Sequence, residues 1–202
     1  MDGTLLNTIG DICHVLNECL ESFGFNKISV EQCTKLVGNG AKSLVERAVG
    51  GEAWEQVYKL YEKKFNESDS LFTTLYKDEE EVLNMLQRRG LKFAVVTNKP
   101  QRATENVCNK LLYKFGFSVC LGQSGKYPLK PDPAATIKAM EIIGLKSDEC
   151  IFVGDGETDV QTAKNAGLKS VSVLWGYRTK SQLEAAGATH FAEKFSDLLN
   201  FV

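Results

Sequence analysis

A short apolar run followed by two spaced aspartates is the feature that most constrains how this chain can fold. Residues 151–153 are apolar and partly β-branched, which is typical of a strand buried in a parallel sheet. Gly154 ends the run, Asp155 and Asp159 follow, and apolar residues then recur at helical spacing up to Gly167. Open α/β sheets bind ligands at such strand-to-helix loops, and carboxylate oxygens suit Mg²⁺. An acidic cap on the helix is the alternative interpretation.

The remaining sequence divides into a helical part and an alternating part. Residues 9–75 carry helical apolar spacing throughout and show no strand pattern. From residue 76 onward, helical segments alternate with short apolar runs, at residues 93–96, 117–121, 151–153, 170–174 and near 190. This alternation is typical of a doubly wound parallel sheet. We therefore predict an α/β protein with a Rossmann-like core, formed by residues 1–8 and 76–202, and an inserted all-helical cap of residues 9–75.

The composition narrows the possible partners and compartments. Of the 202 residues 43% are hydrophobic, enough for a sizeable core, and the formal net charge is −2. No basic stripe points to nucleic acid, and no apolar run approaches the length of a membrane span. The six cysteines contain no Cys-x-x-Cys pair and fall mostly within apolar patterns. We therefore expect a cytoplasmic protein with reduced thiols and no nucleic-acid or membrane partner, whose oligomeric state the sequence leaves open.

Four short polar stretches close predicted strands or lie in loops where strand ends converge. They are Asp2–Thr4, Thr97–Asn98, Lys130–Pro131, and Asp155 with Asp159. Together they offer carboxylates for a metal, a hydroxyl and a backbone amide for phosphate oxygens, and one cation. Phosphoryl transfer needs this set, because its catalysis consists of charge neutralisation, positioning and acid–base chemistry.

Five motifs occur in a fixed order along the chain, at residues 2–7, 36–41, 94–100, 129–133 and 153–159. With them the chain resembles the haloacid dehalogenase superfamily of phosphatases, and within it the phosphoglycolate phosphatase group. The resemblance covers nearly the whole chain. It implies an Mg²⁺-dependent phosphomonoester hydrolase that acts on a small phosphorylated metabolite, with 2-phosphoglycolate favoured.

The resemblance also implies roles for the catalytic residues. Asp2 would be the general acid/base that protonates the leaving alkoxide. Thr97 would donate its hydroxyl to the phosphoryl group, and Asn98 would add its backbone amide. Lys130 would neutralise charge on the phosphate and the nucleophile. Lys99 lies near these residues and ranks below them as a candidate.

The metal and the cap complete the implied site. Asp155 would ligate Mg²⁺ directly, the backbone carbonyl of Asp2 would help to hold it, and Asp159 would orient its water shell. Gly40 and Lys42 lie in a glycine-rich loop that resembles the cap's substrate-facing loop. Its backbone amides and Lys42 would meet a small anionic group such as a carboxylate. Solvent exposure of Lys42 on the polar side of a helix is the alternative.

The same superfamily includes proteins with other functions. A sugar phosphomutase stays an alternative, and a substrate panel that includes a bisphosphorylated sugar would separate the two. Haloacid dehalogenation is disfavoured, because that chemistry does not need Asp155 and Asp159 as an Mg²⁺ site. A non-catalytic relative that binds Mg²⁺ or a phosphate metabolite is the alternative from another functional class.

The first residues of the chain lead to a specific expectation about the nucleophile. The family motif is Asp-x-Asp-Gly-Thr after an apolar strand, and Asp2, Gly3 and Thr4 match its second half, with Met1 at the x position. The nucleophilic Asp would precede Met1. We therefore expect that the natural protein begins upstream of Met1, or that the chain is a non-catalytic relative.

The 202-residue chain is accordingly expected to show negligible phosphatase turnover, even with saturating Mg²⁺. Adding an upstream apolar strand that ends in Asp should restore turnover. Phosphate release with and without that addition is the measurement, and robust Mg²⁺-dependent hydrolysis by the chain as written would overturn the argument.

Overall fold

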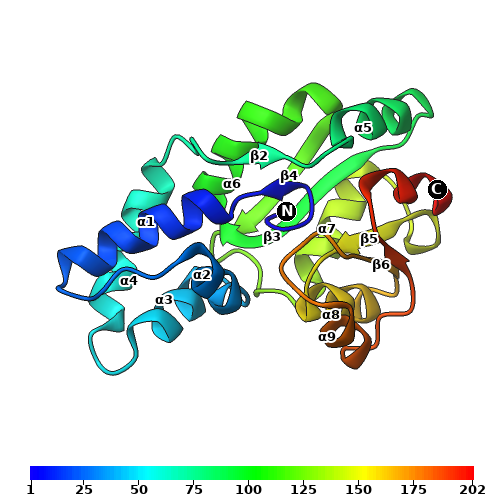
Figure 1. Cartoon of the computed structure of the whole chain (residues 1–202). Coiled ribbons are helices and arrows are strands. Elements are labelled where there is room, and N and C mark those ends of the chain that lie inside the picture. Colours follow the sequence, from blue (N-terminus) through cyan, green and yellow to red (C-terminus); the bar gives the residue numbers. More distant parts are fainter.

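The computed structural model covers residues 1–202 and builds residues 9–67 into a lobe of helices alone (Figure 1). These helices are α1 (Ile9–Ser22), α2 (Val30–Leu36), α3 (Ala41–Val49) and α4 (Trp54–Glu67). Ser29 begins α2 with a capping box, in which its hydroxyl accepts from the backbone N–H of Gln32. Each helix contributes apolar side chains to a core inside this helical lobe, including Leu16, Leu20, Val45, Val57 and Tyr61. None of the chain's helices has the length and apolar character that crossing a membrane requires.

The α/β lobe contains the parallel strands and the helices that connect them. Its strands are β3 (Phe93–Pro100), β4 (Phe117–Gln123), β5 (Ile151–Gly154), β6 (Lys169–Val173) and β7 (Phe191–Ala192). Its α-helices are α5 (Glu79–Arg88), α6 (Gln101–Val107), α7 (Ala134–Ile143), α8 (Glu157–Asn165) and α9 (Lys180–Ala185). Shorter turns of helix are η1 (Cys108–Leu112), η2 (Tyr113–Phe115), η3 (Ser147–Glu149) and η4 (Phe195–Asn200). The predicted alternation of strands and helices after residue 76 is therefore confirmed.

The parallel strands form two sheets, where the sequence predicted one. β3 pairs with β4, and β5, β6 and β7 form a second sheet in that order, with all pairs parallel. No ladder hydrogen bonds join the two sheets, so side-chain packing connects them instead. Their shared core includes Met1, Leu6, Val95, Phe117 and Val173. Burying each such side chain stabilises the fold by about 1.5–3 kcal/mol, so packing links the two sheets without a continuous ladder.

A two-stranded ribbon lies where the chain passes between the lobes. β1 (Leu6–Asn7) pairs antiparallel with β2 (Thr74–Leu75), so the outgoing and returning connections run side by side (Figure 1). The prediction that residues 9–75 contain no strand is therefore wrong at its C-terminal edge. Such a two-residue ladder produces no periodic pattern in the sequence, because it depends on pairing across nearly 70 residues.

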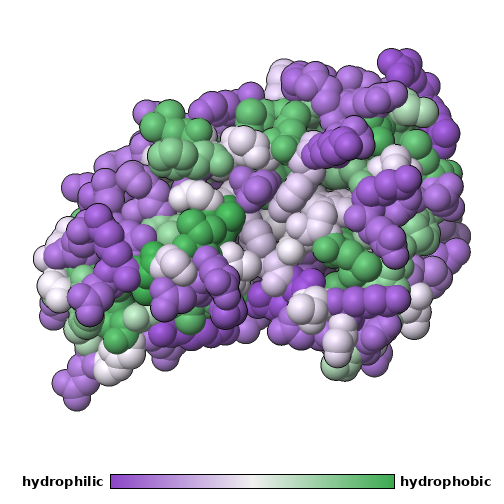
Figure 2. Space-filling view, viewed as in Figure 1, coloured by the Kyte–Doolittle hydropathy of each residue, from purple (hydrophilic) through white to green (hydrophobic).

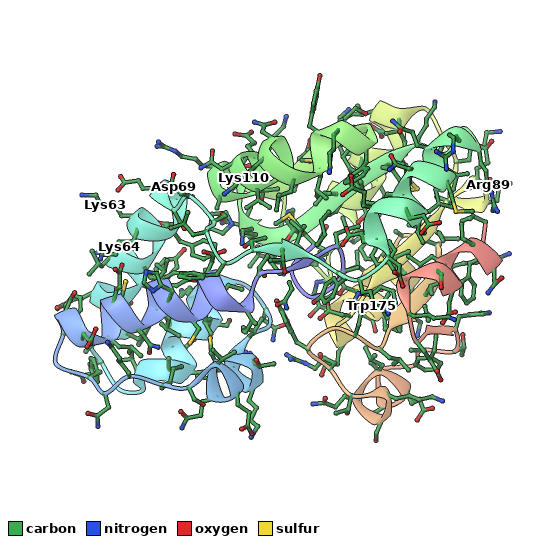
Figure 3. All side chains as sticks on the ribbon, turned by 45° about the horizontal axis from the view of Figure 1, so that its top comes forward. Lys63, Lys64, Asp69, Arg89, Lys110 and Trp175 are labelled. Carbon is green, nitrogen blue, oxygen red and sulfur yellow. The ribbon has the colours of Figure 1, made fainter.

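Polar contacts fix the connections on both sides of this ribbon. The carboxylate of Asp11 in α1 accepts hydrogen bonds from the backbone N–H of Phe72 and the hydroxyl of Thr73. Figure 3 shows Lys110 beside Asp69, and its ammonium group donates to the carbonyl oxygen of Asp69 at 2.6 Å. Trp175, also labelled in Figure 3, donates its indole N–H to the carbonyl oxygen of Thr4 at 2.9 Å. The N-terminal loop is thereby held against the α/β lobe.

Candidate active site

A cavity of about 140 Å³ lies where the helical lobe meets the α/β lobe. Figure 2 shows the surface hollowed between the two lobes. The α/β lobe contributes residues at the C-terminal end of β3 and residues that follow β5, and the helical lobe contributes the loop between α2 and α3. The sequence-predicted residues that line the cavity are Asp2, Gly40, Thr97, Asn98, Lys130, Asp155 and Asp159.

Lys42 is the one predicted site residue that the structure does not bring into the cavity. Its side chain is exposed on α3, and its ammonium nitrogen lies 4.9 Å from the centre of the Trp54 ring. The expectation that Lys42 meets the substrate thus has no support in this geometry. Trp54, the first residue of the next helix, supplies a cation–π contact that the helix periodicity did not indicate.

Asp155 follows β5 and is held by contacts from two distant loops. The Thr4 hydroxyl donates to its Oδ1 at 2.8 Å, and the backbone N–H of Tyr177 donates to its Oδ2 at 3.0 Å. Glycines allow this close approach: a Cβ at Gly3 would lie 2.2 Å from Oδ2, and one at Gly176 would lie 2.2 Å from the Asp155 Cβ. Any larger residue at either position would displace the carboxylate.

Asp159 forms a second carboxylate site at the start of α8. The Lys130 ammonium lies 2.6 Å from its Oδ1, while its Oδ2 accepts from the backbone N–H groups of Asp155 and Gly156 at 3.2 and 3.0 Å. A Cβ at Gly154 would lie 2.3 Å from the Asp159 Cβ, so the strand must end in glycine here. Asp159 therefore caps the helix, as the alternative interpretation proposed, and also fixes the predicted phosphate-binding lysine.

The two carboxyl groups have pKa values shifted in opposite directions. Burial and the neighbouring charge of Asp159 raise the pKa of Asp155 above its ordinary value, despite the hydrogen bonds from Tyr177 and Thr4. Burial acts in the same direction on Asp159, but the Lys130 ammonium, the N-terminal ammonium and the backbone N–H of Gly156 together outweigh it and lower the pKa of Asp159. Burial and the charge of Asp159 outweigh the N-terminal ammonium and the hydrogen bonds that favour the charged form of Asp155.

The residues around Asp155 fit a magnesium ion. A divalent cation beside Asp155 would stabilise the charged carboxylate, and oxygen atoms are the ligands that Mg²⁺ prefers. No three His, Cys, Asp or Glu side chains gather into a complete metal cage. Protein Mg²⁺ sites commonly use only one or two carboxylates, with water and substrate phosphate completing the octahedron. Asp155, with the backbone carbonyl of Asp2 and with Asp159 nearby, is the set that could hold this ion.

Asp2 pairs with a lysine that the sequence analysis ranked low. The buried Lys99 ammonium donates to Asp2 Oδ1 at 3.1 Å and lies 4.2 Å from the centre of the Phe65 ring in α4. Burial raises the pKa of Asp2, but Lys99, the N-terminal ammonium and a hydrogen bond from Thr8 together outweigh that effect and hold the pKa below its ordinary value. Lys99 comes directly after Thr97 and Asn98 in the same motif, and that adjacency is the signal that could have identified it.

Asn98 has a positioning role that the sequence analysis did not assign to its side chain. Its Oδ1 accepts from the backbone N–H of Lys130 at 2.8 Å, and its Nδ2 donates to the Lys130 carbonyl at 3.1 Å. The Thr97 hydroxyl oxygen accepts from the backbone N–H of Lys99 at 3.2 Å, which leaves its own hydrogen free to donate. The end of β3 thus presents a hydroxyl donor and locks the lysine loop beside it.

Arg178 lines the cavity as well, although the sequence analysis gave it no role. It lies in the loop after β6, and its Nε donates to both carboxylate oxygens of Glu157 at 3.1 and 3.0 Å. Its position beyond the carboxyl end of a parallel strand, like that of Asp155, is the signal that could have indicated it.

Comparison with known proteins identifies the family. The family model described as haloacid dehalogenase-like hydrolase matches residues 1–173. The chain belongs to this family. Phosphoglycolate phosphatase 1 of Pseudomonas aeruginosa is 30% identical to this hydrolase, in an alignment that covers 98% of this chain and 76% of that protein. The phosphoglycolate phosphatase of Aquifex aeolicus is 29% identical, covering 88% of this chain and 83% of its own length.

A solved structure agrees with these relatives in fold. The crystal structure of a candidate phosphoglycolate phosphatase from Lactobacillus delbrueckii subsp. bulgaricus matches with a TM-score of 0.91 and 27% identity. The match covers 98% of this chain and 93% of that one. The resemblance that the five motifs indicated is therefore confirmed: this haloacid dehalogenase-like hydrolase is a phosphatase similar to phosphoglycolate phosphatases.

Proposed function

We propose that this hydrolase cleaves the phosphate ester of a small phosphorylated acid with the help of Mg²⁺, and that 2-phosphoglycolate is the favoured substrate. The observation that carries the proposal is the convergence of Lys130, Thr97 and three aspartates on a cavity of only about 140 Å³. Cations and hydroxyl donors in such a cavity match a phosphate group, and its small volume favours a substrate of few atoms. The names of the curated relatives support the same substrate class.

The lobes correspond to a proposed core and cap. Residues 1–8 and 76–202 would form the core, and residues 9–75 the inserted helical cap. The β1–β2 ribbon supports these boundaries, because the chain crosses between the lobes only there. A cap that closes over the cavity excludes water from the reacting groups and strengthens their electrostatic interactions.

Each polar group in the cavity would have a defined task. Mg²⁺, held by Asp155 and the Asp2 carbonyl and oriented through Asp159, would supply a positive charge for the phosphate oxygens. The Thr97 hydroxyl would donate its free hydrogen to a phosphoryl oxygen, and Lys130 would neutralise a second one. The carboxyl of Asp2, kept ionised by Lys99, would take a proton from water and return it to a leaving alkoxide.

Replacing Lys130 by methionine tests the proposed phosphate contact. Lys130→Met keeps the length of the side chain and removes its charge, so affinity for inorganic phosphate in the presence of Mg²⁺ should fall about 10- to 100-fold. Titration calorimetry measures this directly and does not depend on turnover. Lys126→Met is the matched control, because Lys126 lies on the same connection with an exposed side chain outside the cavity. Equal affinities in the two variants would contradict the role of Lys130.

The same assay tests the substrate class. 2-Phosphoglycolate and ethyl phosphate differ in one group, a carboxylate in place of a methyl, so competition between them isolates the contribution of the carboxylate. We expect 2-phosphoglycolate to bind about 10-fold more tightly or better. Equal binding would remove the preference for a phosphorylated acid, and tighter binding of a bisphosphorylated sugar would favour the phosphomutase alternative.

A further inference from the structure

Contacts between the two lobes form one wall of the active-site cavity. A second, polar crevice of about 750 Å³ opens beside the cavity. The two share five lining residues: Asn39, Glu157, Thr158, Tyr177 and Arg178. These residues therefore separate the crevice from the cavity, and they belong to both the α2–α3 loop and the α/β lobe.

Two side-chain hydrogen bonds cross this wall. Arg178 donates through its terminal guanidinium nitrogen to the carbonyl oxygen of Val37, at the end of α2. The hydroxyl of Thr158, in the first turn of α8, donates to Oδ1 of Asn39 at 2.9 Å. Both acceptors lie in the loop that leads into α3 of the helical lobe. These two bonds therefore tie that loop to the α/β lobe.

The α2–α3 loop is shaped to receive the arginine. Gly38 has a φ of +133°, and a Cβ at this position would lie 2.5 Å from the terminal nitrogen of Arg178. Only glycine combines that backbone conformation with such a close approach. On its other side, the two carboxylate oxygens of Glu157 hold the Nε of Arg178. The guanidinium is thus oriented from one lobe and bonded to the other.

We infer that Arg178, oriented by Glu157, is a latch that holds the helical lobe closed over the active site, and that its release opens the cavity to the polar crevice. The inference rests on the proposed function for the ligand that is enclosed. The crevice carries three cations, Lys35, Arg47 and Arg178, against two carboxylates, Glu31 and Glu157. Its positive excess suits the passage of an anionic substrate or product. Arg178 is therefore a positioning residue, which acts through the α2–α3 loop and not on the reacting atoms.

Arg178→Gln tests the latch, since it removes the charge and the Nε–H that donates to Glu157. In the variant, dissociation of inorganic phosphate from the Mg²⁺-saturated protein should accelerate about 10-fold, as expected for the loss of a charge-assisted hydrogen bond that favours the closed state. Small-angle X-ray scattering of the protein without phosphate should show a larger radius of gyration. Arg178→Lys, which keeps a cation that can reach the Val37 carbonyl, should restore part of both effects.

Arg47→Gln is the matched control. Arg47 also donates to carbonyl oxygens of this segment, those of Leu36 and Gly38, but it lies on α3 in the same lobe as its acceptors. Its removal should leave the phosphate dissociation rate and the radius of gyration unchanged. Thr158→Val, which deletes the second cross-lobe bond, should change both in the same direction as Arg178→Gln.

The outcomes separate this inference from the proposed function. An unchanged radius of gyration and an unchanged dissociation rate in Arg178→Gln would overturn the latch. Equal changes in Arg178→Gln and Arg47→Gln would overturn it as well, because they would show general loosening of the loop. If the parent protein bound no phosphate, the proposed function would fail, while the scattering comparison would still decide whether Arg178 holds the lobes together.

Discussion

Asp155→Asn should abolish the stabilisation that Mg²⁺ gives to this hydrolase while leaving the metal-free fold intact. Asparagine has the same shape, and its single carbonyl oxygen can still accept from the backbone N–H of Tyr177. The Thr4 hydroxyl, which donates to the aspartate, can rotate and accept from the new amide nitrogen instead. The substitution therefore removes the charge that would bind the metal and keeps the hydrogen bonds that hold the loops.

The expected effect is large and does not depend on turnover. At an Mg²⁺ concentration about 100 times the dissociation constant, the parent protein should gain about 2.7 kcal/mol of unfolding free energy. The variant should gain none, and calorimetry should show an affinity loss of more than about 100-fold. Without metal, the variant should be at least as stable as the parent, because burial and Asp159 already disfavour the charged form of Asp155.

Asp132→Asn provides a control in the segment that follows Lys130. Asp132 Oδ1 accepts from the backbone N–H of Ala134 at the start of α7, and asparagine caps helices as well as aspartate does. Asp132 does not line the cavity. The control should therefore respond to Mg²⁺ like the parent. A full Mg²⁺-induced shift in Asp155→Asn would place the metal site elsewhere.

Glu79→Gln should remove most of the pH dependence of stability between pH 5 and pH 9. Glu79 begins α5 and is fully buried, with Oε2 accepting from the backbone N–H of Tyr76 at 2.8 Å and Oε1 without a hydrogen-bond partner. Burial raises the pKa of Glu79 to about 8, from an ordinary value of 4.5. The folded protein therefore keeps the carboxyl protonated in a range where the unfolded chain releases the proton.

The sign follows from proton binding. Because the folded state binds more protons, the protonated carboxyl of Glu79 contributes to the free energy of unfolding. This contribution is complete below pH 4.5 and is lost as the pH rises through about 8. The shift of 8 − 4.5 = 3.5 corresponds to a free energy of unfolding on the order of 5 kcal/mol. Glutamine can keep the bond to Tyr76 and does not titrate, so its stability should lack this decline.

Urea unfolding at pH 5, 7 and 9 measures the effect. Glu80→Gln is the matched control, because Glu80 is the next residue on α5, is exposed and pairs with Lys114 at the surface. Surface ion pairs of this kind contribute about 0–1 kcal/mol, so the control should follow the parent. Parallel pH profiles for the parent and Glu79→Gln would show that the buried carboxyl does not govern the stability of this fold.

The sequence also contained a pattern that predicts burial of Glu79, although the charge of its side chain favours the opposite interpretation. Glu79, Val82, Leu83 and Leu86 share one helical stripe, and the last three are core residues. By charge alone, residues 78–81 form an acidic first turn. Such a turn is favourable at a helix start, and its side chains are commonly exposed to solvent. Only the position of α5 against the core shows that the first residue of this stripe is buried.

What the sequence by itself determined was local in character. Helical spacing, strand-like apolar runs and glycine stops each lie within a window of a few residues, so they predicted the helical lobe and the alternating α/β lobe. Short motifs at strand ends predicted which side chains share the cavity, because parallel strands bring their carboxyl ends to one edge. For the same reason the predicted cluster of Asp2, Thr97, Asn98, Lys130, Asp155 and Asp159 appears together around one cavity.

Only the tertiary structure decided the contacts between distant segments. Asp2 and Lys99 are 97 positions apart, and Val37 and Arg178 are 141 apart. No local pattern predicts which of several lysines or arginines reaches such a partner. Lys42 was therefore expected at the cavity, whereas the structure places Lys99 and Arg178 there. The division of the strands into two sheets has the same origin. Periodicity predicts a strand, whereas the neighbour with which it forms hydrogen bonds depends on how the whole chain packs.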